Sequence, residues 1–116
     1  MPDLIQDHPI AQQLDQYTFD ELNEHVETHF AHIDPAKLAR TSPYVVGNFL
    51  ERLTVDERRC ILRKLSIESA SDVLAEMNVE DSAEVLSAMR EFRAARILEL
   101  MDADDAVDLI NQLSET

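Results

Sequence analysis

Hydrophobic residues recur with a constant period through the second half of the chain. From residue 53 onward the sequence divides into five consecutive 12-residue units, each of which opens with Leu or Met. Two adjacent aliphatic residues follow eight and nine positions after each opening residue. A period kept over five units predicts a helical repeat array. The units are LTVDERRCILRK (53–64), LSIESASDVLAE (65–76), MNVEDSAEVLSA (77–88), MREFRAARILEL (89–100) and MDADDAVDLINQ (101–112).

Each unit has the pattern of one short helix. The residue after the opening Leu or Met is Thr54, Ser66, Asn78 or Asp102 in four units, and such side chains accept hydrogen bonds from free N–H groups at helix starts. Isolated helices of this length are marginal in water, so each must bury its apolar stripe against its neighbours. We therefore expect an all-α fold, a right-handed, armadillo-like superhelix of short antiparallel helices. The expected repeat helices lie near 54–64, 66–76, 78–88, 90–100 and 102–113.

The pattern continues upstream in a weaker form. SPYVVGNFLERL (42–53) has Ser42 as N-cap and Pro43 as first helical residue. DPAKLAR (34–40) predicts a shorter helix, and TFDELNEHVETHF (18–30) predicts another with a Thr18–Glu21 capping box. No low-complexity linker divides the chain, so we expect a single domain over 1–116. Its parts are a leading helix or loose segment at 1–17, two helices within 18–41 and the repeats at 42–113.

Charge narrows the classes of partner. The chain has 24 acidic and 10 basic residues, a net charge of −14 and a pI near 4.4, which argues against nucleic acid and anionic membrane surfaces. A divalent ion or a cationic partner fits this charge, and so does acidity that serves only solubility. No apolar run is long enough to span a bilayer, so we expect no direct membrane insertion. The lone Gly47 excludes a glycine-rich phosphate loop, and we predict no enzyme activity.

Three histidines and two groups of arginines form candidate sites. The spacing of His25, His29 and His32 (i, i+4 and i+7) would place them on one face of a helix. Such a face could bind a transition metal, or the histidines could simply be exposed to solvent. We favour the second interpretation, exposed surface histidines. For the arginines within 52–63 and 90–96, the favoured interpretation is charge pairing with adjacent helices. The second interpretation is a docking surface for an acidic partner.

Acidic residues recur at equivalent repeat positions. Seven residues after the opening residue lie Asp72, Glu84 and Asp108, and Asp104 lies one helical turn before Asp108. Helices packed side by side would align such carboxylates along one ridge. Oxygen ligands suit Mg²⁺ or Ca²⁺, and Mg²⁺ needs only one or two carboxylates because it retains several waters. Two interpretations are open at this point, a cation-responsive ridge and a solvated face with helix caps.

A family resemblance favours the first of these two interpretations, the cation-responsive ridge. LSIESASDVLAEMNVEDSAEVLSAM, followed by ILELMDADDAVDLINQL, resembles the N-terminal cytosolic domain of MgtE-type magnesium channels, a superhelix of short helices. The resemblance covers about residues 30–113, and MDADDAVDLINQL is its most specific part. This chain departs from the family where a proline usually follows the N-cap. The residues found instead are Val55, Ile67, Val79 and Ala103.

The resemblance implies a function and a set of metal ligands. In that family, high cytosolic Mg²⁺ bridges acidic residues of this domain and of paired CBS domains, and holds the pore of a dimeric membrane channel closed. The matching residues here are Asp72, Asp104 and Asp108, with Asp105 adjacent. The implied role is a non-catalytic Mg²⁺ sensor on the cytoplasmic side of the cell membrane, which in isolation binds Mg²⁺ weakly.

The implied partners are the CBS and membrane domains of the same parent chain, with the parent a homodimer. Two alternatives remain open, an excised domain and a free-standing protein that consists of the repeat module. A related superhelix occurs in flagellar motor switch and motility-associated proteins, where it is an assembly module. A protein-interaction scaffold is therefore the alternative function.

Overall fold

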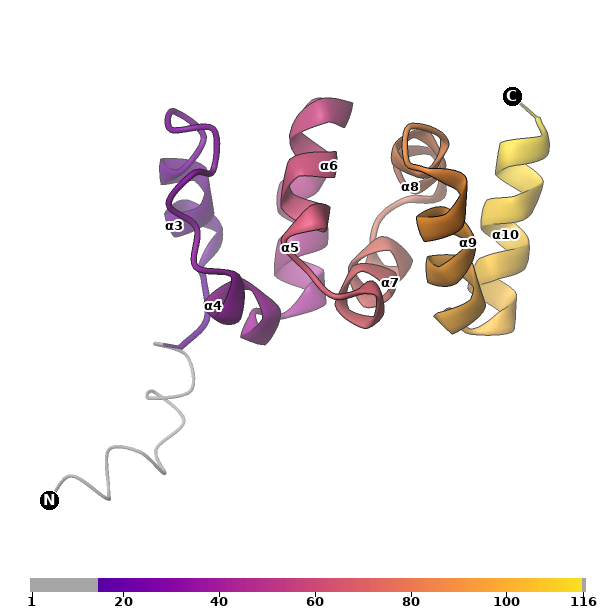
Figure 1. Cartoon of the computed structure of the whole chain (residues 1–116), viewed down its shortest axis with the longest axis horizontal. Coiled ribbons are helices and arrows are strands. Elements are labelled where there is room, and N and C mark those ends of the chain that lie inside the picture. The colour runs from indigo at the N-terminus through magenta and orange to yellow at the C-terminus, as the bar shows by residue number, and fades with distance from the viewer. Residues whose placement is uncertain (1–14, 116) are drawn as a thin grey trace, which may run out of the picture.

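The computed structural model describes residues 15–115, which form eight helices and contain no β-strand (Figure 1). The chain is all-α, as the sequence predicts, and the helices follow one another along the long axis of the molecule. The expected leading helix at 1–17 lies largely outside the described residues. In chain order the helices are α3 (Phe19–Glu24), α4 (Pro35–Arg40), α5 (Pro43–Leu50), α6 (Val55–Arg63), α7 (Ile67–Glu76), α8 (Val79–Ser87), α9 (Glu91–Leu100) and α10 (Ala103–Ser114).

All five predicted repeat helices are confirmed, and each N-cap is the residue directly after the opening Leu or Met. The side chains of Thr54, Ser66 and Asn78 each accept a hydrogen bond from the backbone N–H three residues later. Asp102 was expected to do the same for α10. It occupies the N-cap position, but its carboxylate accepts no capping hydrogen bond within the described helix. Its negative charge still lies near the positive end of the helix dipole.

The predicted capping box at Thr18 is present, and a second capping box lies at Thr54. The Thr18 backbone N–H donates to Glu21 Oε1 at 3.1 Å, and the Glu21 N–H donates to the Thr18 hydroxyl at 3.2 Å. The same pattern joins Thr54 and Glu57. Hydrogen bonds from Thr18, with a smaller contribution from the Lys37 ammonium, hold the pKa of Glu21 below its ordinary value. These contacts determine where α3 and α6 begin.

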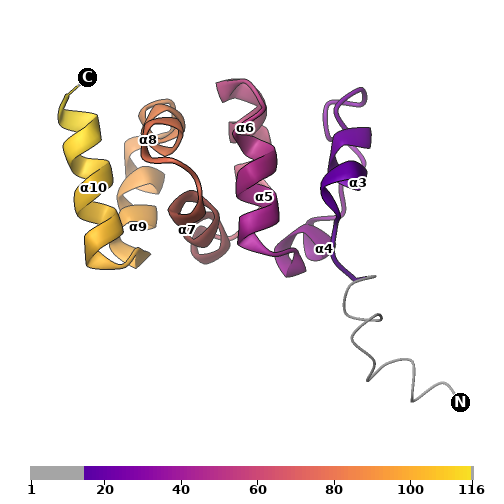
Figure 2. The ribbon, with the colours of Figure 1, turned by 180° about the vertical axis from the view of Figure 1, so that it is seen from behind.

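Helices two apart in the sequence pack against each other, which produces two rows. α3, α5, α7 and α9 form one row, and α6, α8 and α10 form the other. Figures 1 and 2 show the rows from opposite sides, with α3 at one end of the molecule and α10 at the other. This arrangement is the repeat array that the 12-residue period predicts, while the handedness of its superhelix stays a prediction.

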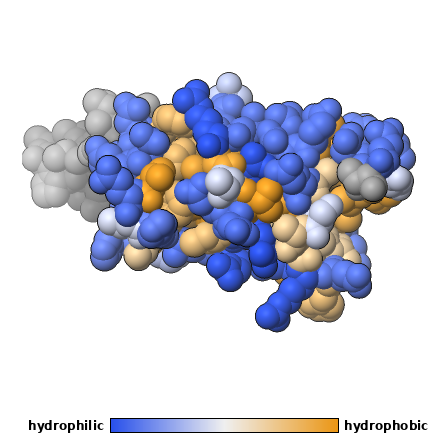
Figure 3. All heavy atoms as spheres, turned by 90° about the horizontal axis from the view of Figure 1, so that it is seen from above, coloured by the Kyte–Doolittle hydropathy of each residue, from blue (hydrophilic) through white to orange (hydrophobic). Residues whose placement is uncertain are grey.

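The repeat positions determine which residues form the core. The aliphatic residue eight positions after the opening residue is buried in all five units. The next residue is buried as Leu62, Leu74 and Leu86, but Leu98 is half-buried and Ile110 is 49% exposed. Burial therefore decreases toward α10. Figure 3 shows a mainly hydrophilic face with a broken band of apolar side chains along its middle.

The lone glycine lies where two helices approach closely. At Gly47 on α5, an added Cβ atom would lie 3.3 Å from the Val73 carbonyl oxygen and 3.3 Å from Met77 Cγ, both in the α7 region. Glycine inside a helix is less favourable than alanine by about 0.5–1 kcal/mol. The close α5–α7 packing accounts for its presence here.

One predicted helix is shorter than expected. The segment 18–30 was expected to be a single helix, but α3 ends at Glu24 and a series of turns follows. His29 and Phe30 have φ angles of 52° and 65°, in the left-handed region that non-glycine residues rarely adopt. The reversal places the Phe30 ring in the core, 1% exposed and edge-on to Phe49 at 6.0 Å between centroids. Burial of this ring offsets the local backbone strain.

Candidate functional site

Two of the predicted metal ligands lie on the solvent-facing side of α10. Asp104 and Asp108 are one helical turn apart and exposed, and neither has an ion-pair partner among residues 15–115. Val107 lies between them and is 53% exposed, and Asn111 continues the same side of the helix. We call this surface, formed by Asp104, Val107, Asp108 and Asn111, the α10 outer face. It combines unpaired carboxylates with an apolar side chain.

A small cavity adjoins this face, between α10 and the α7–α8 pair. It measures about 120 Å³, and both Asp105 and Asp108 line it, together with Met77 and Leu109. Ser82 also lines it, but its hydroxyl already donates to the Leu74 carbonyl oxygen at 2.7 Å. A cavity of this size accommodates several waters. The structure thus brings Asp105 and Asp108 together at one opening.

Asp72, the fourth predicted ligand, lies elsewhere. It is exposed on α7 and lines a different cavity of about 260 Å³, next to α4 and the start of α5. Arg40 lines the same cavity. Within the described part of the chain, no three His, Cys, Asp or Glu side chains come close enough to hold a metal ion. Asp72 and the α10 carboxylates therefore do not form one ligand set by themselves.

Glu84, the middle residue of the series Asp72, Glu84 and Asp108, also lies apart from the other two. Glu84 contacts Arg58 on α6 at 3.4 Å, and Glu84 and Glu80 line a third cavity with Gln112. Asp72, Glu84 and Asp108 thus line three separate cavities. The equal spacing in the sequence does not place them at one shared opening.

The histidines do not share a helical face, because the helix expected to align them ends at Glu24. His25 is half-buried and lies edge-on to the Tyr17 ring at 5.7 Å between centroids, whereas His29 and His32 are exposed in the following turns. The Tyr17 hydroxyl accepts a hydrogen bond from the Asp34 N–H, which anchors this turn to the start of α4.

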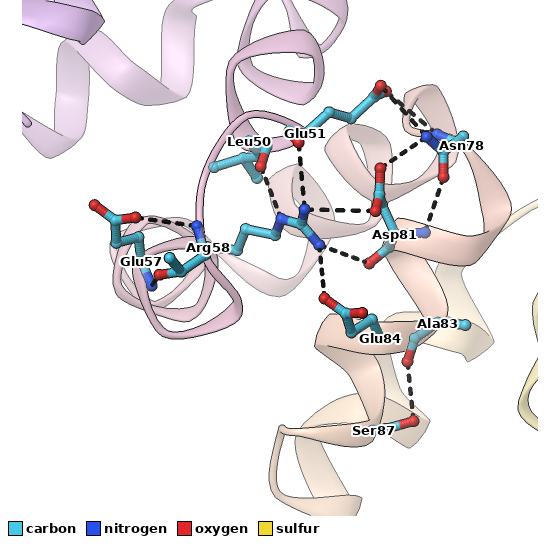
Figure 4. A network of polar contacts seen from close by, with 10 residues as sticks. Leu50, Glu51, Glu57, Arg58, Asn78, Asp81, Ala83, Glu84 and Ser87 are labelled. Carbon is cyan, nitrogen blue, oxygen red and sulfur yellow. Dashed lines mark hydrogen bonds and ion pairs between the residues drawn. The ribbon is translucent and has the colours of Figure 1, made fainter. Parts of the chain in front are cut away.

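Charge pairing between helices, predicted for the arginines, is confirmed at Arg58 (Figure 4). This residue is only 5% exposed, and its guanidinium joins three helices. It donates to the Leu50 carbonyl at 2.8 Å and the Glu51 carbonyl at 3.3 Å, at the C-terminus of α5. It also contacts the carboxylates of Asp81 and Glu84 on α8, each at 3.4 Å. Arg58 therefore fastens α6 to both α5 and α8.

A signal for Arg58 was present in the repeat. Five residues after the opening residue, the other units have alanine or serine, at positions 70, 82, 94 and 106. These small side chains are buried or half-buried, which marks the position as facing neighbouring helices. A long cation at such a position must find acceptors within the fold, because an unpaired buried charge is very unfavourable.

No helix in residues 15–115 has both the length and the apolar character needed to cross a lipid bilayer. The fold and surface define a class, an all-helical repeat module with an acidic outer face. A family model described as the MgtE intracellular N domain matches residues 41–116, which is more than half of the chain. The chain therefore belongs to the MgtE intracellular N domain family, and the resemblance noted in the sequence is confirmed. No match was found among curated proteins or among solved structures.

Proposed function

We propose that this domain senses Mg²⁺ and regulates a magnesium transporter without catalysing a reaction. In this proposal one or two carboxylates at a time, from among Asp104, Asp105 and Asp108, bind a hydrated Mg²⁺, and Asp72 contributes to a second acidic contact. Acidic residues of CBS domains in the same parent chain complete the site, and the closed homodimeric channel is favoured when Mg²⁺ is high. The domain acts on the cytoplasmic side of the cell membrane.

The observation that carries this proposal is the unpaired state of the α10 carboxylates. Acidic side chains of this chain find partners where arginines are near, as Asp81 and Glu84 do at Arg58. Asp104 and Asp108 have no such ion pair within the described residues, although they are adjacent on the helix surface. Their mutual repulsion is relieved by a divalent cation.

The neighbouring cavity supports the binding of a hydrated cation such as Mg²⁺. Mg²⁺ binds through one or two carboxylates and keeps several waters, and the 120 Å³ beside Asp105 and Asp108 has room for such waters. The exposed Val107 and Ile110 supply apolar area against which a partner domain would pack. The same apolar area supports the alternative proposal, a protein-interaction scaffold whose contacts do not depend on Mg²⁺.

Thermal unfolding of the 1–116 chain separates these proposals. We expect millimolar MgCl₂ to raise the Tm by a few degrees more than NaCl of equal ionic strength. A ligand at about ten times its Kd stabilises the folded state by about 1.4 kcal/mol. Asp104→Asn combined with Asp108→Asn should abolish most of this excess, because the ligands are removed while the side-chain shapes are kept.

The matched control is Glu24→Gln combined with Glu27→Gln. Both glutamates are exposed, have no ion pair among the described residues and lie far along the chain from α10. This control lowers the negative charge by the same amount and should keep the Mg²⁺ excess. Equal losses in the two double variants would mean diffuse screening, and the sensing role of α10 would be wrong.

A further inference from the structure

Four arginines surround a cavity on another part of the surface. It measures about 150 Å³ and lies between the second half of α6 and the first turn of α9. Met89 forms the apolar part of its lining. We call this feature the arginine pocket. Its charged lining consists of Arg59, Arg63, Arg90 and Arg93.

Most of this positive charge is not neutralised within the fold. Arg63 and Arg90 are exposed and have no ion-pair partner in residues 15–115. The one ion-pair partner of Arg59 in that part of the chain is Asp56, at 3.8 Å, and the Asp56 side chain is 93% exposed to water. Although the chain has 24 acidic residues, few of them neutralise these four adjacent arginines within residues 15–115. Like charges held this close repel unless an anion lies between them.

Arg93 is held in place with one donor unused. Its Nη2 donates to the carbonyl oxygens of Leu62 at 2.8 Å and Leu65 at 3.2 Å, at the end of α6. Its Nε is buried and has no hydrogen-bond partner, the sole such side-chain atom found in the described residues. A buried donor without an acceptor is unfavourable, and a bound oxyanion would satisfy it. The two carbonyl contacts thus fix the Arg93 guanidinium at the wall of the pocket.

The N-terminus of α9 adds to the positive electrostatic potential at the pocket. α9 has ten residues, and its N-cap is Arg90, which makes no capping hydrogen bond within the described helix. The first N–H groups of an α-helix lack intrahelical partners and carry a partial positive charge. Glu91 is the one acidic residue in this first turn. An anion in the pocket would therefore contact guanidinium groups and would also lie near a helix N-terminus.

We propose that the arginine pocket binds the carboxylate side chains of an acidic segment of a partner protein. Guanidinium forks pair with carboxylates through two parallel hydrogen bonds. An acidic segment carries several carboxylates and can contact more than one of the four arginines at once, which a single small anion does less well. Phe92, which is 74% exposed on the same turn, offers an apolar contact next to the pocket. This surface is separate from the proposed Mg²⁺ site.

An NMR titration of the 1–116 chain tests this proposal, with a capped hexaglutamate peptide and inorganic phosphate as separate probes at about 0.1 M NaCl, where the Debye length is about 10 Å. We expect saturable binding of the peptide, with the largest shifts at the Arg93 Nε–H and the amides of residues 90–93. Arg63→Gln combined with Arg90→Gln should weaken this binding about tenfold, since two charged contacts are lost.

The matched control is Arg40→Gln combined with Arg52→Gln. It changes the net charge equally and removes arginines that do not line the pocket. Binding to this variant should change less than about twofold, apart from screened long-range effects. Equal weakening in both double variants, or no saturable peptide binding, would overturn the proposal. Saturable binding of phosphate without binding of the peptide would overturn it as well, and would assign the pocket to a phosphate group.

Discussion

Replacing Arg58 by methionine is expected to lower the free energy of unfolding by about 2–4 kcal/mol. Methionine keeps much of the apolar stem but leaves the Leu50 and Glu51 carbonyls without their guanidinium donor. It also leaves Asp81 and Glu84 facing each other without a cation. The estimate is below that for a fully buried ion pair, because the Glu84 side chain is 60% exposed and water resolvates it. Urea denaturation followed by circular dichroism measures this change.

Arg59→Met is the matched control for Arg58→Met. Arg59 is the next residue on α6, and its one ion pair within residues 15–115 is with the exposed Asp56, at 3.8 Å. Such surface pairs contribute little, so the control should change stability by less than about 0.5 kcal/mol. A similar loss in both variants would show that the buried network does not join α6 to α5 and α8.

The second large effect is expected in the aromatic cluster. Phe49→Ala should destabilise the domain by about 3–5 kcal/mol, because a buried ring is replaced by a cavity. Phe49 is 1% exposed, and its ring contacts Phe19 and Phe30 edge-on, at 5.6 and 6.0 Å between centroids. Its loss would also remove the contact that holds the reversed turn at Phe30.

Tyr44→Ala is the control on the same helix, since Tyr44 is 63% exposed. It should cost less than about 1 kcal/mol in the same denaturation experiment. If Phe49→Ala proved equally mild, the cluster between α3, α5 and the 25–32 turn would not be a part of the cooperative core.

The repeat region was predictable because the signals agree locally. The 12-residue period, the N-cap residues and the paired aliphatic positions all indicate the same helix boundaries, and the structure has them. The turn after α3 was not predictable in this way. Residues 25–30 continue an apolar pattern suited to a helix, but burial of Phe30 against Phe49 overrides it. The partner in that contact lies far along the chain, so no local pattern shows it.

The candidate sites show the same difference between features set by local sequence and features set by contacts between distant residues. Asp104 and Asp108 are predictable as neighbours because helical spacing alone brings them together. The separation of Asp72 from them depends on how α7, α8 and α10 pack, which the repeat period does not specify. Arg58 and Arg93 contact groups that lie up to 26 and 31 residues away in sequence. The exceptional position of Arg58 in the repeat was visible, but the partners of both arginines were not.

Binding of Mg²⁺ at the α10 carboxylates can be measured by an NMR titration of the 1–116 chain with MgCl₂. A parallel NaCl titration at equal ionic strength accounts for screening. We predict saturable amide shifts that are confined to residues 103–109 and the walls of the adjoining cavity, and that disappear in the Asp104→Asn, Asp108→Asn double variant. Shifts spread over all acidic segments, equal in both salts and unchanged in the variant, would contradict the account.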